Sequence, residues 1–224
     1  LHRDAPQSQV LIHLPPFLNR DTLPAASDLT GPMLSVGMMR SAAKLPSYRI
    51  IAETLAMLPD TGWSLQIAGD GPARAEVEAL MVPFGDKVRC LGALDEAALR
   101  EVYRRSSLLF WPGVDEAFGM VYLEAQAAGL PVIAQNRPGV REVLAGVSQP
   151  AVQGGPAALA ARITDLMNNP AKRHKAASEA RNMITQHHLL PAAAQVLEFA
   201  TVATGAVKSI NTSKSLITAA RLST

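Results

Sequence analysis

Short apolar stretches alternate along the chain with longer segments of helical periodicity. Each apolar stretch has the length of a buried strand, and turn-forming Gly or Pro residues follow most of them. We therefore predict strands at residues 9–14, 33–37, 63–68, 87–91, 108–111 and 131–134. Strands that alternate with crossover helices are typical of an α/β fold, here a doubly wound and mainly parallel sheet.

Between these strands, apolar residues recur at the spacing of one face of an amphipathic helix. The pattern predicts helices over 46–58, 73–82, 95–103 and 119–128, and late helices over 156–167, 171–187 and 191–203. Asp95 suits a helix N-cap, and Gly129 suits a helix end. We expect a linker over 1–8, one domain over 9–204 that includes the late helices, and a loose tail over 205–224.

The composition is that of a globular protein. Hydrophobic residues make up 48% and charged residues 18% of the 224 residues, and the net charge is +2. Aromatic residues make up only 4%, and Lys and Arg are scattered among acidic residues, so we expect no nucleic-acid partner. No apolar run reaches the length of about 18 residues that a membrane-spanning helix needs. The single cysteine, Cys90, is compatible with a reducing compartment, and we expect a cytoplasmic protein.

Two features near the end of the chain leave alternatives open. Lys208, Lys214 and Arg221 follow Glu198 without any further acidic residue, which indicates a solvated tail or, alternatively, contact with a membrane surface or a partner. His187 and His188 stand side by side on a late helix, where we predict surface residues rather than metal ligands.

In a doubly wound sheet, ligands bind in the loops that follow the carboxyl ends of the strands. Glu116 lies in such a loop, and Glu124 follows eight residues later inside the next predicted helix. Gly119 stands at the junction, where the free N–H groups of a helix start can hold an anion. A diphosphate flanked by polyols would suit this arrangement, because carboxylates accept hydrogen bonds from hydroxyl groups.

The segment around these glutamates resembles a known signature. Glu-x-Phe-Gly-x-x-x-x-Glu-Ala, from Glu116 onwards, and the later Ala-Gly-Leu-Pro-Val resemble the Glu-x7-Glu signature of group 1 (family 4) glycosyltransferases of GT-B fold. Other segments resemble the same family in the same order: Pro15 to Phe17, Ser35 to Gly37, Ile67 to Pro72, Val88 to Gly92 and Gly139 to Val143. The resemblance implies the C-terminal, Rossmann-like donor-binding domain of such an enzyme, with extra C-terminal helices.

The resemblance also implies roles for individual residues. Glu116 would be the catalytic residue, in contact with the hydroxyl groups of the donor sugar, and Glu124 would bind the ribose. Arg40 and Lys44 would neutralise the diphosphate as the glycosidic bond breaks. The implied donor-binding residues are Gly37, Arg40, Lys44, Gly69, Asp70, Leu91, Gly92, Phe118, Gly119, Met120, Val121 and Glu124.

The chain departs from the family pattern in the loop after the second predicted strand. Met38 stands where the family usually has Arg, and Leu45 stands where it has Gly. Arg40 is therefore assigned by residue type and proximity, and a plain surface Arg is the alternative. Gly113 also replaces a frequent Ser.

We expect transfer of a sugar from a nucleotide diphosphate sugar to an acceptor, with retention of configuration and without a metal or cofactor. GT-B enzymes pair two domains, so the implied partner is the N-terminal domain of the same enzyme, and we expect no activity without it. The alternatives are a non-catalytic nucleotide-sugar-binding or regulatory module and a GT-B-fold epimerase. A dinucleotide site is disfavoured, because Gly-x-Gly-x-x-Gly does not follow the first predicted strand.

Overall fold

A computed structural model of the chain describes residues 12–60, 62–144, 146 and 149–203. Its centre is a five-stranded sheet with the order β3-β2-β1-β4-β5, in which all pairings are parallel. The strands are β1 (Met33–Val36), β2 (Leu65–Ala68), β3 (Val88–Gly92), β4 (Leu108–Phe110) and β5 (Val132–Ile133). The predicted α/β fold with a parallel sheet is confirmed.

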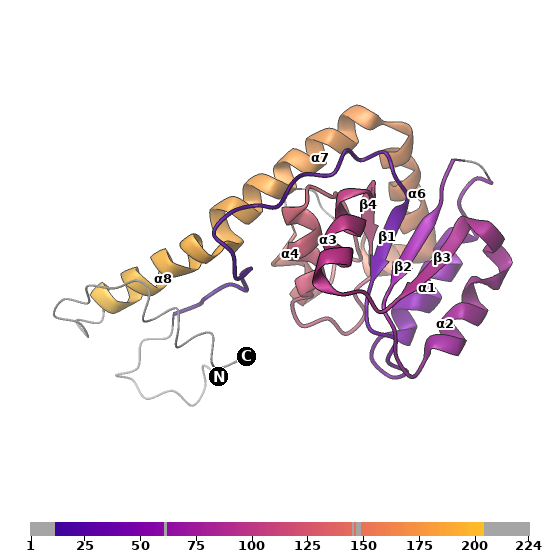
Figure 1. Cartoon of the computed structure of the whole chain (residues 1–224), viewed down its shortest axis with the longest axis horizontal. Coiled ribbons are helices and arrows are strands. Elements are labelled where there is room, and N and C mark those ends of the chain that lie inside the picture. Colours follow the sequence, from indigo (N-terminus) through magenta and orange to yellow (C-terminus); the bar gives the residue numbers. More distant parts are fainter. Residues whose placement is uncertain (1–11, 61, 145, 147–148, 204–224) are drawn as a thin grey trace. The chain divides into compact units, whose positions relative to one another are not determined.

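Helices cover the sheet on both faces (Figure 1). They are α1 (Leu45–Leu55), α2 (Arg74–Met81), α3 (Glu96–Arg104), α4 (Met120–Ala127), α5 (Pro138–Arg141), α6 (Gly155–Asn168) and α7 (Pro170–Met183). Right-handed crossovers place α1 and α2 on one face and α3 and α4 on the other. α6 packs against α1, and α7 packs against α4, so these two helices extend the two helical layers.

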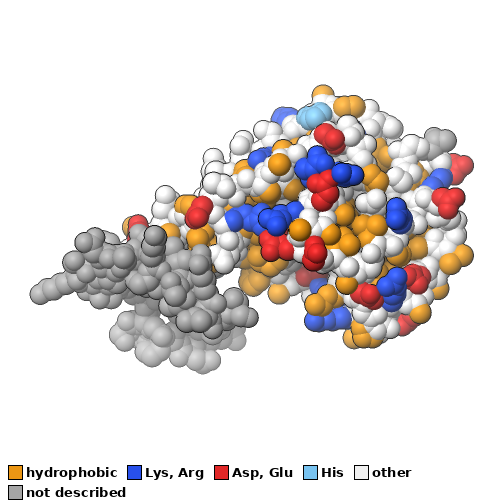
Figure 2. All heavy atoms as spheres, viewed as in Figure 1, with side chains coloured by type: hydrophobic (Ala, Val, Ile, Leu, Met, Phe, Trp, Pro, Cys, Tyr) orange, Lys and Arg blue, Asp and Glu red, His pale blue; other side chains and the backbone are white. Residues whose placement is uncertain are grey.

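The apolar stretches of the sequence form the buried core of the sheet, as their pattern predicts. Leu34, Leu108, Leu109 and Phe110 on the two central strands are fully buried, as is typical of a parallel sheet covered on both faces. Asp95 caps α3 as predicted, because its carboxylate accepts a hydrogen bond from the N–H group of Ala98 at 2.8 Å. On the face drawn in Figure 2, Lys and Arg side chains lie interspersed with Asp and Glu.

The chain divides into two compact units. The first, Leu23–Ile184, contains the whole sheet. The second consists of residues 1–22 and 185–224 and includes α8 (Leu190–Ala203). Within it, Leu18 forms a parallel bridge with Leu189, and the N–H group of Leu18 donates to the carbonyl of His188 at 2.7 Å. The predicted linker over 1–8 and tail over 205–224 lie outside the described residues.

Two predictions are wrong. Residues 12–14 of the strand expected over 9–14 are not in a strand, and residues 9–11 lie outside the described part. A strand is stabilised by hydrogen bonds to a neighbouring strand, and in the described ranges no strand pairs with residues 12–14. His188 was expected on the surface but is only 2% exposed, because its Nδ1 lies 2.7 Å from the carbonyl oxygen of Pro16 and the ring is enclosed.

Helix boundaries differ from the prediction by a few residues. The helix expected over 171–187 ends as α7 at Met183 and continues as a π-helix over Ile184–His188. The short helix α5 and the 3-10 segments Val82–Lys87 and Val152–Gly154 were not predicted, since elements of this length carry too few residues for a periodic pattern. No helix in the described ranges combines the length and the apolar character needed to cross a membrane.

Candidate functional site

The strand order reverses between β1 and β4, because β1 leads to β2 on one side and β4 leads to β5 on the other. In open α/β sheets, ligands bind beyond the carboxyl ends of the strands at this reversal. The loop after β1 carries Lys44, and the loop after β4 carries Glu116. The topology therefore brings two predicted site residues that are 72 positions apart in sequence to the same edge of the sheet.

An ion pair joins these two loops. The Lys44 ammonium group donates to Glu116 Oε1, and the two side chains are only 19% and 12% exposed. The same oxygen accepts a second hydrogen bond, at 3.0 Å, from the indole N–H group of Trp111. A partly buried cation and a carboxylate thus face the place where the fold class binds its ligands.

A further hydrogen bond fixes the loop after β4 against the neighbouring helix. The N–H group of Val114 donates to Ser47 Oγ at 3.0 Å, and Ser47 is fully buried in the first turn of α1. Asp115, next to Glu116, adopts a left-handed backbone conformation with a φ of 55°. Glu116 therefore sits on a loop whose backbone is held from α1.

Gly119 starts α4 in a conformation that favours glycine. Its φ is 62°, and a Cβ there would lie 2.5 Å from the ring of Tyr122. No side chain caps this helix, and in the described structure the N–H groups of Met120 and Val121 have no protein acceptor. These groups form a positive helix end close to Glu116 in sequence, which can hold an anion.

Glu124 lies one turn into α4 and is half-buried. Its Oε2 accepts a hydrogen bond at 3.0 Å from the hydroxyl group of Tyr103 on α3. Burial, and then the adjacent Glu124 carboxylate, raise the pKa of Tyr103 well above its usual value. The Tyr103 hydroxyl therefore stays protonated and remains a donor to Glu124.

The other predicted residues lie at the same edge of the sheet but outside the ion pair. Arg40 is exposed, and no carboxylate among the described residues pairs with it. Asp70 accepts from the N–H group of Gly71 at 2.8 Å and pairs with Arg74 at 3.0 Å. Asp70 thus already has partners within its own turn.

Leu91 and Gly92 end β3, an edge strand. The carbonyl of Gly92 accepts from the N–H group of Gly69 at 2.8 Å, which places these two residues side by side. β1 and β2 separate them from β4 and hence from Glu116. The predicted site residues therefore extend over several strand ends of the sheet.

Phe118 and Met120 follow Glu116 closely in the sequence, and they are 46% and 43% exposed. Gly37 contacts the other loop directly, because a Cβ on Gly37 would lie 2.6 Å from the Trp111 ring. The two loops that flank the strand reversal are therefore in van der Waals contact as well as ion-paired.

Sequence reasoning missed Trp111, Tyr103 and Ser47. Each is a polar partner of a predicted residue or loop. Trp111 and Tyr103 are of a type that predicts core packing, and Ser47 is of a type common at a helix start. Only the position of Trp111 directly after a buried strand could have drawn attention to it.

Among the described residues, no three His, Cys, Asp or Glu side chains cluster as a metal site would require.

The model of the family "Glycosyl transferases group 1" matches residues 42–183, which include Lys44, Glu116 and Glu124. The chain belongs to the group 1 glycosyltransferases. The resemblance of the motifs to group 1 glycosyltransferases is thereby confirmed.

Individual curated proteins and solved structures are also similar to this chain. The phosphatidyl-myo-inositol mannosyltransferase of Mycobacterium leprae is 27% identical over 200 residues, which cover 78% of this chain and 54% of the relative. A structure of a mutant of S. aureus TarM with fondaparinux, α-GlcNAc-glycerol and UDP superposes with a TM-score of 0.66 at 17% identity, covering 81% of this chain and 37% of that one. For Anabaena HepE with UDP-glucose, the TM-score is 0.63 at 21% identity, with 77% and 49% covered.

At these identities the two structures show the fold and no more. The chain spans about half of the length of the curated relatives it matches, or less.

Proposed function

We propose that this chain supplies the donor-binding part of a glycosyltransferase that moves a sugar from a nucleotide diphosphate sugar to an acceptor, with retention of configuration. The Lys44–Glu116 ion pair at the reversal of the strand order carries the proposal. It places a cation suited to phosphate beside a carboxylate suited to sugar hydroxyl groups. Both lie where this fold class binds ligands.

In the proposed reaction, the bond between the anomeric carbon and the diphosphate oxygen breaks. The diphosphate leaves with the electron pair, and the acceptor oxygen bonds to the anomeric carbon and passes its proton to the departing diphosphate. Lys44 and the free N–H groups at the start of α4 stabilise the charge that develops on the diphosphate. Arg40 adds a second cation from the same loop.

Glu116 accepts hydrogen bonds from hydroxyl groups of the sugar and thereby orients the anomeric carbon. Glu124, held by Tyr103, accepts from the ribose hydroxyl groups. Gly69, Asp70, Leu91 and Gly92 complete the donor site towards the base. The residues named need no metal or cofactor for these roles.

The solved relatives suggest which donor to test first. The structures of S. aureus TarM and Anabaena HepE contain UDP and UDP-glucose, respectively. A uridine nucleotide is therefore the first candidate, and GDP-sugars are the second.

Calorimetric titration with UDP and GDP tests the proposal. We expect Glu124→Ala to weaken binding of the preferred diphosphate by about 1–3 kcal/mol, the range for a hydrogen bond to a charged group. Glu53→Ala is the matched control, because Glu53 is exposed on α1. Unchanged affinity in folded Glu124→Ala would remove Glu124 from the site, and lack of binding by the unaltered chain would overturn the proposal.

A further inference from the structure

Trp111 is a buried tryptophan whose only polar side-chain atom faces the candidate catalytic carboxylate. It is 0% exposed and follows directly after β4. Its indole N–H group donates to Glu116 Oε1 at 3.0 Å. We propose that Trp111 is a positioning residue, which holds Glu116 in place while the sugar of the donor binds. The inference rests on the proposed function.

The backbone of Trp111 is fixed on both sides. Its N–H group donates to the carbonyl of Ile133 at 3.0 Å, which continues the pairing of β4 with β5. Its carbonyl accepts from the buried hydroxyl group of Tyr122 at 3.1 Å. The indole therefore projects from a backbone that has little freedom to shift.

The ring is fixed as well. It meets the ring of Tyr48 edge to face, with centroids 5.2 Å apart and planes at 77°. The hydroxyl group of Tyr48 donates to the carbonyl of Gly37 at 2.6 Å, and Gly37 in turn lies against the indole. Tyr48, Gly37 and the backbone after β4 thus hold the indole in an orientation that points its N–H group towards Glu116.

Glu116 Oε1 has two donors of different kinds, Lys44 and Trp111. The Lys44 ammonium group is charged and sits on a flexible stem, so a diphosphate attracts it. The indole N–H group is neutral and rigidly held, and it has no acceptor capacity that a ligand could exploit. When Lys44 turns to the diphosphate, Trp111 still holds the carboxylate.

The hydrogen bond from Trp111 to Glu116 affects how the sugar of the donor binds. A carboxylate offers about four acceptor positions, so the bond from Trp111 leaves capacity for sugar hydroxyl groups. Without that bond, the Glu116 side chain would have more rotamers open to it once Lys44 has turned away, and each contact with the sugar would first require ordering it. Trp111 therefore acts on sugar recognition and not on the binding of the nucleotide.

The test compares each nucleotide sugar with its parent diphosphate: UDP-glucose with UDP, and GDP-mannose with GDP. Trp111→Phe keeps an aromatic ring against Tyr48 and Gly37 but removes the N–H group. We expect calorimetry to show a loss of about tenfold in affinity for the nucleotide sugar, from one hydrogen bond to a charged group. The affinity for the parent diphosphate should change less than about twofold.

A double-mutant cycle with Glu116→Ala separates positioning from a structural role. If Trp111 acts through Glu116, then Trp111→Phe has no further effect on sugar affinity once Glu116→Ala is present. Trp63→Phe is the matched control, because the indole of Trp63 donates to the carbonyl of Pro59 at 2.7 Å, away from this site. We expect Trp63→Phe to leave the ratio of the two affinities unchanged.

Equal losses for sugar and diphosphate, or a full effect of Trp111→Phe beside Glu116→Ala, would overturn the inference while leaving the proposed function standing. Lack of binding of either diphosphate by the unaltered chain would overturn both. If Trp111→Phe does not fold, benzothienylalanine at position 111 in a Trp63→Phe background replaces only the N–H group by sulfur. The same tenfold loss, about 1.4 kcal/mol, is expected there, and its absence would overturn the inference.

Discussion

At the scale of single residues, the candidate site is organised around one oxygen atom. Lys44 and Trp111 both donate to Glu116 Oε1, so a diphosphate that binds Lys44 has to compete with Glu116. The pair is mostly buried, which weakens screening by salt and keeps both side chains oriented. Removing Lys44 would leave the Glu116 carboxylate without its counter-charge, next to the place proposed for the diphosphate.

Lys44→Ala should weaken the binding of a nucleoside diphosphate much more than the binding of the bare nucleoside. We expect a loss of roughly 1.5–3 kcal/mol for UDP or GDP, because a charge-assisted bond is lost and a carboxylate is left facing an anion. The affinity for uridine or guanosine should hardly change. Calorimetric titration of both ligands measures the difference.

Lys175→Ala, on an exposed position of α7, is the control for the loss of one positive charge. An equal loss for nucleoside and diphosphate would show that Lys44 does not contact the phosphates. The same comparison for Arg40→Ala decides whether Arg40 is a phosphate ligand or a plain surface residue.

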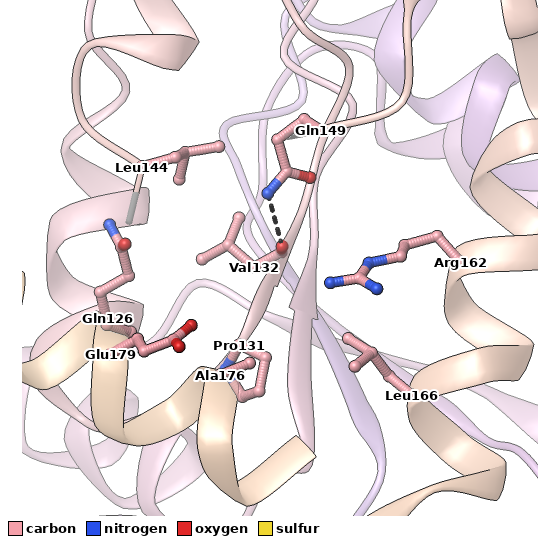
Figure 3. A pocket seen from close by; sticks show the side chains of 10 residues that line it. Gln126, Pro131, Val132, Leu144, Gln149, Arg162, Leu166, Ala176 and Glu179 are labelled. Atoms are coloured by element: carbon pink, nitrogen blue, oxygen red, sulfur yellow. Dashed lines mark hydrogen bonds between the residues drawn. The ribbon is translucent and has the colours of Figure 1, made fainter. Parts of the chain in front are cut away.

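At the scale of elements, β5 is a short edge strand whose outer side is covered by one side chain. The amide of Gln149 accepts from the N–H group of Ala134 at 3.0 Å. It also donates to the carbonyl of Val132 at 3.1 Å, the bond drawn in Figure 3. These are the two bonds that a neighbouring strand would make, so Gln149 blocks pairing of this edge with another chain. A cavity of about 20 Å³ lies beside it, lined also by Arg162 and Glu179.

Gln149→Ala should lower the free energy of unfolding by about 1–2 kcal/mol, since it leaves a backbone donor and acceptor of β5 without these partners. Urea denaturation followed by circular dichroism measures the change. Gln153→Ala, at an exposed position, should stay within about 0.5 kcal/mol of the unaltered chain. Equal stabilities of the two variants would show that water replaces the Gln149 amide at no cost.

The contact between residues 16–20 and 188–190 should depend on pH. Burial lowers the pKa of His188, opposed by its hydrogen bond to Pro16 and reinforced by His187. The unfolded state, with an ordinary pKa near about 6.5, therefore binds more protons than the folded state once the pH falls through that value. Stability is then lost as the pH falls and levels off below the folded pKa.

Hydrogen exchange of the Leu18 and Leu190 amides, which donate to His188 and Arg20, reports this change. We expect protection at pH 7.5 and faster opening at pH 5.5, after correction for the intrinsic exchange rate. His188→Gln, which stays neutral, should abolish the pH dependence of the exchange. His174→Gln, at an exposed position of α7, should keep it. A dependence that survives His188→Gln would assign it to another group.

At the scale of the whole molecule, the chain matches its family over 42–183 and spans about half of its relatives' length, or less. In the proposed reaction, the candidate site would supply groups for the diphosphate, the sugar and the ribose of a donor. Transfer also needs an acceptor held within near-attack distance and exclusion of water. GT-B enzymes meet this need by pairing two domains.

Residues 1–224 alone should therefore bind a nucleoside diphosphate and transfer no sugar. A matching N-terminal domain, fused before the first residue or added in trans, should restore turnover, measured as release of UDP or GDP. Glu116→Ala should abolish that turnover. Robust transfer by residues 1–224 alone would contradict the two-domain proposal, and binding without transfer in the fused protein would favour a regulatory module.

The sequence by itself determined strands β1 to β5, the longer helices, the sheet type and the family. Strand and helix periodicity are local properties, so β1 to β5 and the capping of α3 by Asp95 could be predicted from neighbouring residues. The spacing of Glu116 and Glu124 around Gly119 is also local, and it identified the loop that the structure places at the strand reversal.

Only the tertiary structure decided which of these residues meet. The bond between Lys44 and Glu116 depends on the order of the strands, and the bonds from Trp111 and Tyr103 depend on which way buried rings point. Of the strand predicted over 9–14, the described residues 12–14 pair with no strand, and such pairing is also a long-range property. Residue type and spacing carry no record of such long-range pairings, and packing selects them.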